Sequence, residues 1–257
     1  MKIALVGFGK MGHMLKDVSL SHGHSVVITC DSIAKDADFI SSDSEKIAQA
    51  VKNSGAEGII EFSHPSAVLN NLNALIPTGI PLVVGTTGWH DKISSITKLV
   101  ESANSSLLYS SNFSIGVNLF YKIVEEAAAI MNSFDEYDVA SWELHHNQKA
   151  DSPSGTALEI ANRVLKNIDR KTTIVTDSFK RKPEPQEFHV ASVRLGSVPG
   201  THTVAFDSSA DTIELTHTAR NRGGFALGAV RALEWLVSPN KDNALKKGVF
   251  TMNDVMN

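Results

Sequence analysis

The segment Gly7-Phe8-Gly9-Lys10-Met11-Gly12 is the strongest indication of the fold in this sequence. It follows a short apolar run, residues 3–6, and opens a segment with helical periodicity. In this setting the first glycine permits a tight turn, the second lets the backbone approach a pyrophosphate, and the third allows close packing of helix on strand. The N-terminus of the helix attracts the phosphate charge. We therefore expect all six residues to form a dinucleotide-binding loop.

An acidic residue at the end of the next apolar run supports this interpretation. The run 26–30 is followed by Asp31, about 20 residues beyond the glycines, where a carboxylate meets the hydroxyls of the adenosine ribose. A carboxylate accepts from a free 2′-hydroxyl but repels a 2′-phosphate, and residue 32 is serine rather than arginine. Lys35 could still reach a phosphate. We therefore expect NADH, NADPH or both as cofactor, with NADH favoured.

The first half of the chain alternates short apolar runs with segments of helical period. The expected strands are residues 3–6, 26–30, 58–62, 81–84 and 106–110, and the expected helices are 11–22, 44–52, 65–76 and 92–103. Such alternation is typical of a parallel sheet with helices on both faces. The sequence thus predicts a Rossmann-type, doubly wound α/β fold.

Two polar segments follow expected strands at the carboxyl edge of this sheet. They are Gly85-Thr86-Thr87 and Ser110-Ser111-Asn112-Phe113. Ligands of open α/β sheets bind beyond the carboxyl ends of the strands. We therefore expect both segments to contact the nicotinamide half of the cofactor.

In the second half of the chain, the expected strands no longer alternate regularly with helices. Strand-like runs at 137–145, 188–194, 201–206 and 212–217 are accompanied by one expected helix, 156–166. This order predicts a second, α+β domain with a mixed or antiparallel sheet. A last helical segment, 225–237, is expected to return to the first domain.

Composition excludes several classes of partner. The net charge is −4 and no run of five like charges occurs, which argues against nucleic acid and anionic membranes as partners. The apolar N-terminal run is too short for a signal peptide or a membrane span. The only cysteine, Cys30, cannot form an intramolecular disulfide, as suits a reducing cytoplasm. We expect a cytoplasmic protein with a small-molecule substrate.

A dense group of polar residues lies at the end of the expected strand 137–145. Residues 143–157 read Glu-Leu-His-His-Asn-Gln-Lys-Ala-Asp-Ser-Pro-Ser-Gly-Thr-Ala. An imidazole can donate a proton near neutral pH, and Lys149 can hold an anion or act as an acid. Ser154, Gly155 and Thr156 can present backbone amides and a hydroxyl to a carboxylate at a helix N-terminus. The segment predicts a site for an anionic substrate.

A metal centre at the two adjacent histidines is disfavoured. Neighbouring residues of a strand point to opposite faces, which disfavours binding of one metal ion by both His145 and His146. No third histidine or cysteine stands at a ligand-like spacing. We therefore expect no metal.

The segment 143–157 resembles the dihydrodipicolinate (4-hydroxy-tetrahydrodipicolinate) reductase family of lysine and diaminopimelate biosynthesis. The resemblance continues through the glycine loop, Gly85-Thr86-Thr87 and Asn112-Phe113-Ser114, and through later segments as far as Ala232. It covers nearly the whole chain. It implies a dinucleotide-binding domain of residues 1–113 and 225–257, and a substrate-binding and oligomerisation domain of residues 114–224. It also implies a homotetramer.

The resemblance implies roles for individual residues. In the family reaction a cyclic imine dicarboxylate loses its hydroxyl as water, accepts hydride at C4 and is protonated at C3. By position, His145 is the proton donor and Lys149 a second acid. His146 would contact substrate, with Gly155 and Thr156 holding a carboxylate. Three further residues are either additional contacts or ordinary surface charges and ion pairs: Arg194, His202 and Arg222.

Departures from the family pattern keep alternatives open. Ser32 stands where many members have arginine, and Asn147 and Gln148 replace a more basic pair. Another Rossmann-type amino- or imino-acid dehydrogenase would share the first domain but not depend on Lys149. An NADH-binding sensor would bind dinucleotide without turnover.

Overall fold

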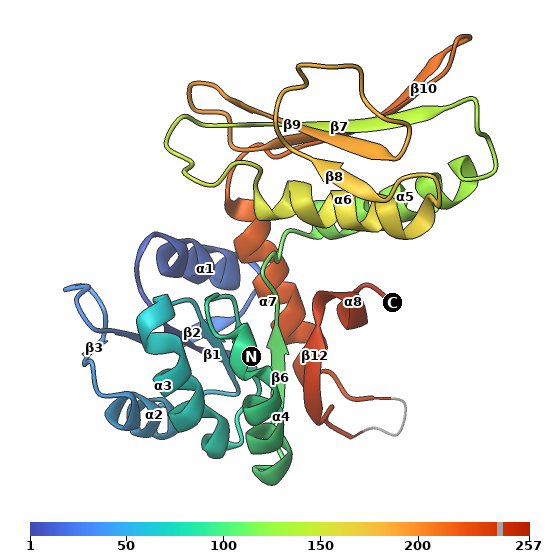
Figure 1. The fold of residues 1–257 in the computed structure, drawn as a ribbon. Coiled ribbons are helices and arrows are strands. Elements are labelled where there is room, and N and C mark those ends of the chain that lie inside the picture. The colour runs from blue at the N-terminus through green and yellow to red at the C-terminus, as the bar shows by residue number, and fades with distance from the viewer. Residues whose placement is uncertain (241–243) are drawn as a thin grey trace. The chain divides into compact units, whose positions relative to one another are not determined.

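The chain folds into two compact units (Figure 1). The computed structural model describes residues 1–240 and 244–257. Unit 1 comprises Met1–Ile115 and Gly223–Asn257, and unit 2 comprises Gly116–Arg222. The last long helix, α7 (Gly223–Val237), therefore belongs with the N-terminal part of the chain.

Unit 1 is built on a seven-stranded sheet in the order β3-β2-β1-β4-β5-β6-β12, and all its pairings are parallel. The strands are β1 (Lys2–Val6), β2 (Ser25–Asp31), β3 (Phe39–Ile40), β4 (Gly58–Glu61), β5 (Leu82–Val84), β6 (Ser106–Tyr109) and β12 (Gly248–Thr251). Their apolar residues are buried because helices cover both faces. The strand order reverses between β1 and β4, which creates the switch point where such sheets bind ligands. The Rossmann-type prediction is confirmed.

The helices of unit 1 form two layers. One face of the sheet packs on α2 (Ser44–Asn53), α3 (Pro65–Leu75) and α4 (Ile93–Ser102). The other packs on α1 (Lys10–Ser21), α7 and α8 (Met252–Val255). Short 3-10 turns occur at Ile76–Thr78 and His90–Lys92. The layers hold the carboxyl ends of β1, β4, β5 and β6 at one edge.

Unit 2 is built on a five-stranded mixed sheet in the order β11-β10-β7-β9-β8. The strands are β7 (Asp138–His145), β8 (Thr173–Val175), β9 (Glu187–Arg194), β10 (Thr201–Asp207) and β11 (Thr212–Thr218). Strand β10 pairs antiparallel with β7 and β11, whereas β7–β9 and β8–β9 are parallel. The predicted mixed sheet is confirmed.

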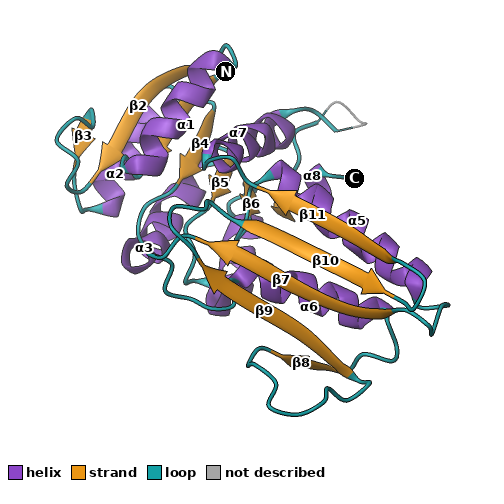
Figure 2. Cartoon of the chain, turned by 90° about the horizontal axis from the view of Figure 1, so that it is seen from above, coloured by secondary structure: helices purple, strands orange, loops and turns teal. Residues whose placement is uncertain are grey.

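Two helices, α5 (Ile115–Met131) and α6 (Gly155–Asn167), lie across one face of the unit 2 sheet (Figure 2). Their apolar residues form a core with every second residue of β7, β9 and β10. The residues between these point to the opposite face, where Trp142 and Leu144 are partly exposed and Val193 is 48% exposed. One face of the sheet thus packs into a core, and the other is partly exposed.

Several helices and strands of the structure are not among those expected from the sequence. These are α5, α8 and the short strands β3, β8 and β12. Helix α5 is apolar around much of its circumference, with Leu119, Ile123 and Ile130 exposed, so no single apolar stripe marks it. Among the described residues, none of the helices combines the length and apolar character needed to cross a bilayer.

Candidate active site

The glycine loop of unit 1 is shaped by close backbone contacts. Gly7 has φ +93°, and a Cβ there would lie 2.1 Å from the carbonyl oxygen of Phe62. A Cβ on Gly12 would lie 2.4 Å from the carbonyl oxygen of Gly7. Only glycine fits at either position. These two residues therefore set the turn and the packing of α1 on β1.

Gly9 differs because a Cβ there would meet no atom within 4 Å. It is the N-cap of α1, and neither a side-chain cap nor an acidic residue in the first turn competes for the helix N-terminus. Such an end offers N–H donors and a positive dipole to an anion. The loop thus fits the pyrophosphate of a dinucleotide, with Gly9 leaving room for it. Lys10 and Met11, the first residues of α1, lie beside this space.

The Asp31 side chain stabilises the glycine loop through hydrogen bonds to backbone N–H groups. Its Oδ2 accepts from the backbone N–H of Phe8 at 2.7 Å, and its Oδ1 accepts from those of Ile33 at 2.8 Å and Ala34 at 2.9 Å. Burial alone would raise the pKa of Asp31, but these N–H donors outweigh it and lower the pKa. A carboxylate offers about four lone-pair positions. Asp31 therefore supports the loop and keeps capacity to accept from a ribose hydroxyl.

The other expected cofactor segments lie at the same edge of the sheet. Gly85 follows β5, and a Cβ there would collide with the Phe62 ring at 2.0 Å. Thr86 is buried and accepts from the Ser63 N–H at 2.8 Å, whereas Thr87 is exposed. The side chains of Phe8 and Thr86 are buried, so the backbone is the part of these residues that could contact a ligand.

The segment after β6 is similarly arranged. Asn112 donates its N–H to Ser110 Oγ at 3.1 Å and accepts from the Ser114 N–H at 2.9 Å. Ser111 is exposed, while Phe113 is 1% exposed and belongs to the core. A Cβ on Gly228 of α7 would lie 1.7 Å from the Phe113 carbonyl oxygen, so α7 packs directly on this turn.

Glu61 is a buried acid at the same edge of the sheet, and it is not among the site residues expected from the sequence. Glu61, at the end of β4, is fully buried and accepts from Ser63 Oγ and, at 3.2 Å, from Asn71 Nδ2. Burial raises the pKa of this carboxyl. The sequence contains a sign of this site, because a glutamate follows directly after the apolar run Gly58-Ile59-Ile60.

In unit 2 the register of the mixed sheet assembles a row of polar side chains. Glu143 of β7 lies opposite Ser192 of β9 on one side and His202 of β10 on the other. His217 of β11 lies opposite His202. A second pair, His145 with Arg194, follows two residues later on the same, helix-facing side. Residues up to 74 positions apart in sequence thus meet at the end of β7.

Glu143 is the centre of this row. It is fully buried, and its Oε1 accepts from the Ser154 N–H at 2.9 Å, from Ser192 Oγ at 3.0 Å and from Arg194 Nη2 at 3.1 Å. Its Oε2 accepts from Ser154 Oγ. Burial alone would raise the pKa of Glu143, but the hydrogen bonds from Ser154, the nearby His145 and the hydrogen bond from Ser192 lower it. The residue is therefore a buried carboxylate.

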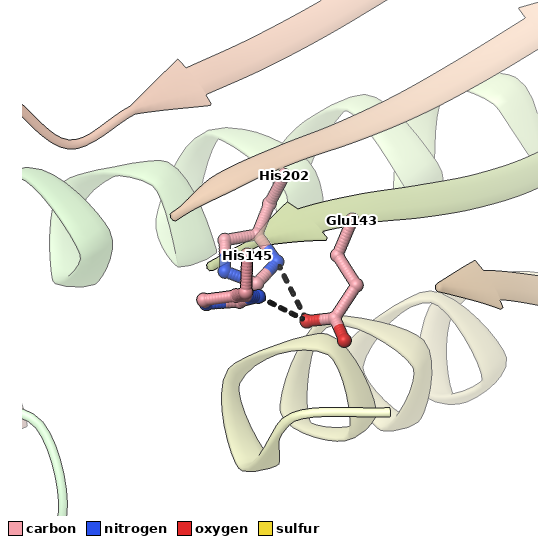
Figure 3. A group of neighbouring side chains, drawn as sticks. All are labelled: Glu143, His145 and His202. Carbon is pink, nitrogen blue, oxygen red and sulfur yellow. Dashed lines mark ion pairs between the residues drawn. The ribbon is translucent and has the colours of Figure 1, made fainter. Parts of the chain in front are cut away.

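Two imidazoles face the same oxygen of Glu143 (Figure 3). The Nδ1 atoms of His145 and His202 lie 3.1 Å and 3.8 Å from Oε2, and their rings meet edge to face at 5.2 Å. Within the described residues neither Nδ1 has a hydrogen-bond partner. Burial lowers the pKa of His202 to about 4 and also lowers that of His145, where Glu143 opposes the effect and Lys149 and Arg194 add to it.

The loop after β7 brings cations to this cluster. Lys149 is paired with Asp151 at 2.8 Å, and that hydrogen bond lowers the pKa of Asp151. Arg194 donates to the carbonyl oxygens of Lys149, at 3.4 Å, and of Asp151. His146 is partly exposed just beyond the strand, and Arg222 is exposed at the end of unit 2. An anion arriving here would meet cationic groups on one side.

Helix α6 supplies backbone donors beside the cluster. Ser154 is its N-cap and accepts from the Ala157 N–H at 3.2 Å, while Gly155 is exposed and a Cβ there would meet nothing within 4 Å. Thr156 follows in the first turn. Because Ser154 also donates to Glu143, the helix N-terminus is fixed relative to His145.

Glu143, His145 and His202 could also be considered as metal ligands, since one atom from each lies within 4.8 Å of the others. The arrangement appears in the fold although no ligand spacing marks it in the sequence. However, the Arg194 guanidinium lies 3.1 Å from the same carboxylate, and a dication would be repelled by it. The Arg194 guanidinium therefore disfavours a metal ion at this cluster.

Comparison with known proteins points to one family over the whole chain. Residues 1–113 match the family model described as dihydrodipicolinate reductase, N-terminus, and residues 116–256 match the one described as dihydrodipicolinate reductase, C-terminus. A relative from Christiangramia forsetii, named 4-hydroxy-tetrahydrodipicolinate reductase, is 38% identical over 100% of this chain and 98% of its own length. One of the same name from Archaeoglobus fulgidus is 35% identical, with both chains fully covered.

A solved structure has the same fold. Dipicolinate-bound dihydrodipicolinate reductase from a Paenisporosarcina species superposes with a TM-score of 0.75 at 20% sequence identity. The alignment covers 98% of this chain and 97% of the other.

Proposed function

The chain belongs to the dihydrodipicolinate reductase family, and from this premise we propose the reaction that its site catalyses. The substrate is 4-hydroxy-2,3,4,5-tetrahydrodipicolinate, which loses water to form a conjugated cyclic imine. Reduction of this imine gives tetrahydrodipicolinate, an intermediate of lysine and diaminopimelate biosynthesis. When bound, the reduced nicotinamide supplies the hydride.

One observation carries the assignment of the substrate site. The sheet register places the His145 imidazole at the end of β7, next to the loop that carries Lys149 and the N-terminus of α6. A cyclic dicarboxylate needs two anion-binding groups and an acid, and this segment offers them together. The reductase from the Paenisporosarcina species binds dipicolinate, a cyclic dicarboxylate, which supports a ligand of this class.

The residues of the chain then have distinct tasks. Gly155 and Thr156 hold one carboxylate at the helix N-terminus, and His146 contacts the substrate from the strand end. As hydride arrives at C4, electron density moves onto the conjugated ring system and C3 requires a proton. His145 in its imidazolium form donates that proton, and Lys149 serves as the second acid. The proton is later replaced from solvent.

The cofactor is NADH or NADPH, with NADH favoured. The uncapped N-terminus of α1 and the space above Gly9 support binding of the pyrophosphate. The Asp31 carboxylate, held ionised by three backbone N–H groups, favours a free ribose hydroxyl over a phosphate. The contacts of the nicotinamide half are assigned to the segments after β5 and β6.

The assembly is proposed to be a homotetramer in the cytoplasm. The unit 2 sheet leaves Trp142, Leu144 and Val193 on the face opposite its helices, and an open apolar sheet face is stabilised by burial against another copy. The buried, unpaired Cys30 suits a reducing compartment.

The test is turnover of the substrate. The condensation product of pyruvate and aspartate semialdehyde is supplied with NADH or NADPH in parallel, and oxidation of the nicotinamide is followed by absorbance. The proposal predicts turnover with at least one cofactor and a higher kcat/KM with NADH. Absence of nicotinamide oxidation with both NADH and NADPH would contradict the proposal. Reduction of a different imino acid would then favour another dehydrogenase. Binding of dinucleotide without turnover would favour a sensor.

A further inference from the structure

We propose that Glu143 is a positioning residue for proton donation: it fixes the tautomer of His145, stabilises its imidazolium form and ties it to the N-terminus of α6. The inference rests on the proposed function, which makes His145 the acid. It concerns a fully buried residue to which the proposed function gives no contact with substrate or cofactor.

The contacts of Glu143 join the two halves of the substrate site. Its carboxylate accepts both the backbone N–H and the hydroxyl of Ser154, the N-cap of α6. The same carboxylate lies 3.1 Å from His145 Nδ1. The next residue along the helix, Gly155, begins the turn that receives the substrate carboxylate. One buried group therefore sets the distance between the anion-binding helix end and the acid.

The orientation of the imidazole follows from electrostatics. A carboxylate beside Nδ1 favours the tautomer with hydrogen on that atom, and it stabilises the ring when Nε2 is also protonated. Nε2 points toward Gly200, where a Cβ would come within 3.0 Å of it. Glycine at this position thus avoids a side-chain contact with the Nε2 edge of His145. The Nδ1 contact lacks hydrogen-bond geometry here, and such contacts in ligand-free sites often tighten when substrate binds.

Charged or titratable groups approach His145 from several elements. The groups are Glu143 on β7, Lys149 and Asp151 on the following loop, Arg194 on β9, His202 on β10 and, behind it, His217 on β11. Glu143 and Asp151 favour the imidazolium, while burial, Lys149 and Arg194 oppose it. Glu143 is fully buried, lies 3.1 Å from His145 Nδ1 and raises the pKa of His145 more than Asp151 does, so its removal has the larger effect on the acid.

The first experiment measures His145 directly by nitrogen NMR of histidine-labelled protein, with the resonance assigned by a His145→Gln variant. The proposal predicts that neutral His145 in the wild-type protein carries its hydrogen on Nδ1. A neutral ring protonated on Nε2 would overturn it. This measurement needs neither substrate nor a folded Glu143 variant, so its outcome is separate from that of the turnover assay.

The second experiment compares Glu143→Gln, Glu143→Asp and the control Ser192→Ala, which removes one hydrogen bond to Glu143 but leaves its charge. Glu143→Gln is expected to lower the pKa of His145, to move the descending limb of the kcat/KM profile to lower pH and to reduce kcat about 10²-fold. The Kd for NADH should stay unchanged.

Relative to Glu143→Gln, the Glu143→Asp variant should have a higher kcat and a His145 pKa closer to that of the wild type. Ser192→Ala should change neither the His145 tautomer nor the descending limb of the kcat/KM profile. A loss of kcat in Glu143→Gln with an unmoved His145 pKa and pH limb would show a purely structural role and contradict the proposal. A melting temperature for each variant establishes that the compared proteins are folded.

Discussion

At the scale of single residues, His145 lies between a buried carboxylate and two cations. Glu143 is 3.1 Å from its Nδ1, and Lys149 and Arg194 act on it from the loop and from β9. The balance in the ligand-free protein favours the neutral ring, because burial lowers the pKa of His145 below its ordinary value of 6.5. A bound dianion shifts this balance back toward the imidazolium.

The first prediction concerns pH. The acid acts in its protonated form, so kcat/KM should be highest at low pH and fall as the pH rises through the His145 pKa of the free enzyme, below 6.5. The corresponding limb in kcat should lie at higher pH because the substrate dianion stabilises the imidazolium. Profiles measured at saturating cofactor test this. A kcat/KM that rises through this range would contradict the role of His145 as an acid.

The second prediction separates chemistry from cofactor binding. His145→Ala and Lys149→Ala should each lower kcat by about 10²- to 10⁴-fold, the usual contribution of a general acid. Their Kd for NADH, measured by fluorescence titration, should match that of the wild type. Asn147→Ala, an exposed neighbour, serves as control and should retain kcat. A loss of NADH binding that parallels the loss of kcat would refute the assignment of these residues to the substrate site.

At the scale of elements, the turn between β1 and α1 combines two kinds of glycine. Gly7 and Gly12 are required by the protein itself, since a Cβ would strike backbone oxygens at 2.1 Å and 2.4 Å. At Gly9, by contrast, a Cβ would meet no atom within 4 Å in the described part of the chain, so the protein itself does not require glycine there. This open space agrees with the proposed role of Gly9, which is to let the cofactor approach the backbone.

The third prediction follows from this difference. Gly12→Ala should lower the free energy of unfolding by about 1–3 kcal/mol, the usual cost of overpacking. Gly9→Ala should leave the free energy of unfolding nearly unchanged but weaken NADH binding, because its Cβ enters the space for the pyrophosphate. Urea unfolding and NADH titration of both variants provide the measurements. Equal NADH affinity in Gly9→Ala and wild type would argue against this loop as the phosphate site.

The elements also show what sequence alone can supply. The strands of unit 1 are visible as short apolar runs, and the glycines and Asp31 are local signals, so the Rossmann-type sheet was predictable. Helix α5 was not, because its apolar residues do not form one stripe. The Glu143 cluster depends on the register of β10 and β9 against β7, and no spacing along the chain encodes which residues face one another.

At the scale of the whole molecule, the two sides of the unit 2 sheet differ in character. Its helix-facing side carries the polar row of the site, and its other side carries partly exposed apolar residues. Because both sides belong to the same strands, assembly through the open face would also stiffen the strands that hold Glu143 and His145.

The fourth prediction tests that assembly. Val193→Glu places a charge on the open face of β9, and burying it in an interface would be costly. Light scattering after gel filtration should show a tetramer for the wild type and smaller species for the variant. Leu20→Glu, on an exposed position of α1, is the matched control and should remain tetrameric. A monomeric wild type would contradict the proposed assembly.

The most direct test of the central claim is isotope transfer. NADH deuterated at the transferred position of its nicotinamide C4 is incubated with the enzyme and the cyclic product of pyruvate and aspartate semialdehyde, and the tetrahydrodipicolinate is analysed by mass spectrometry and NMR. We predict one deuterium, located at ring C4, in the enzymatic product. A product without deuterium, or with deuterium at another carbon, would contradict the proposed hydride transfer.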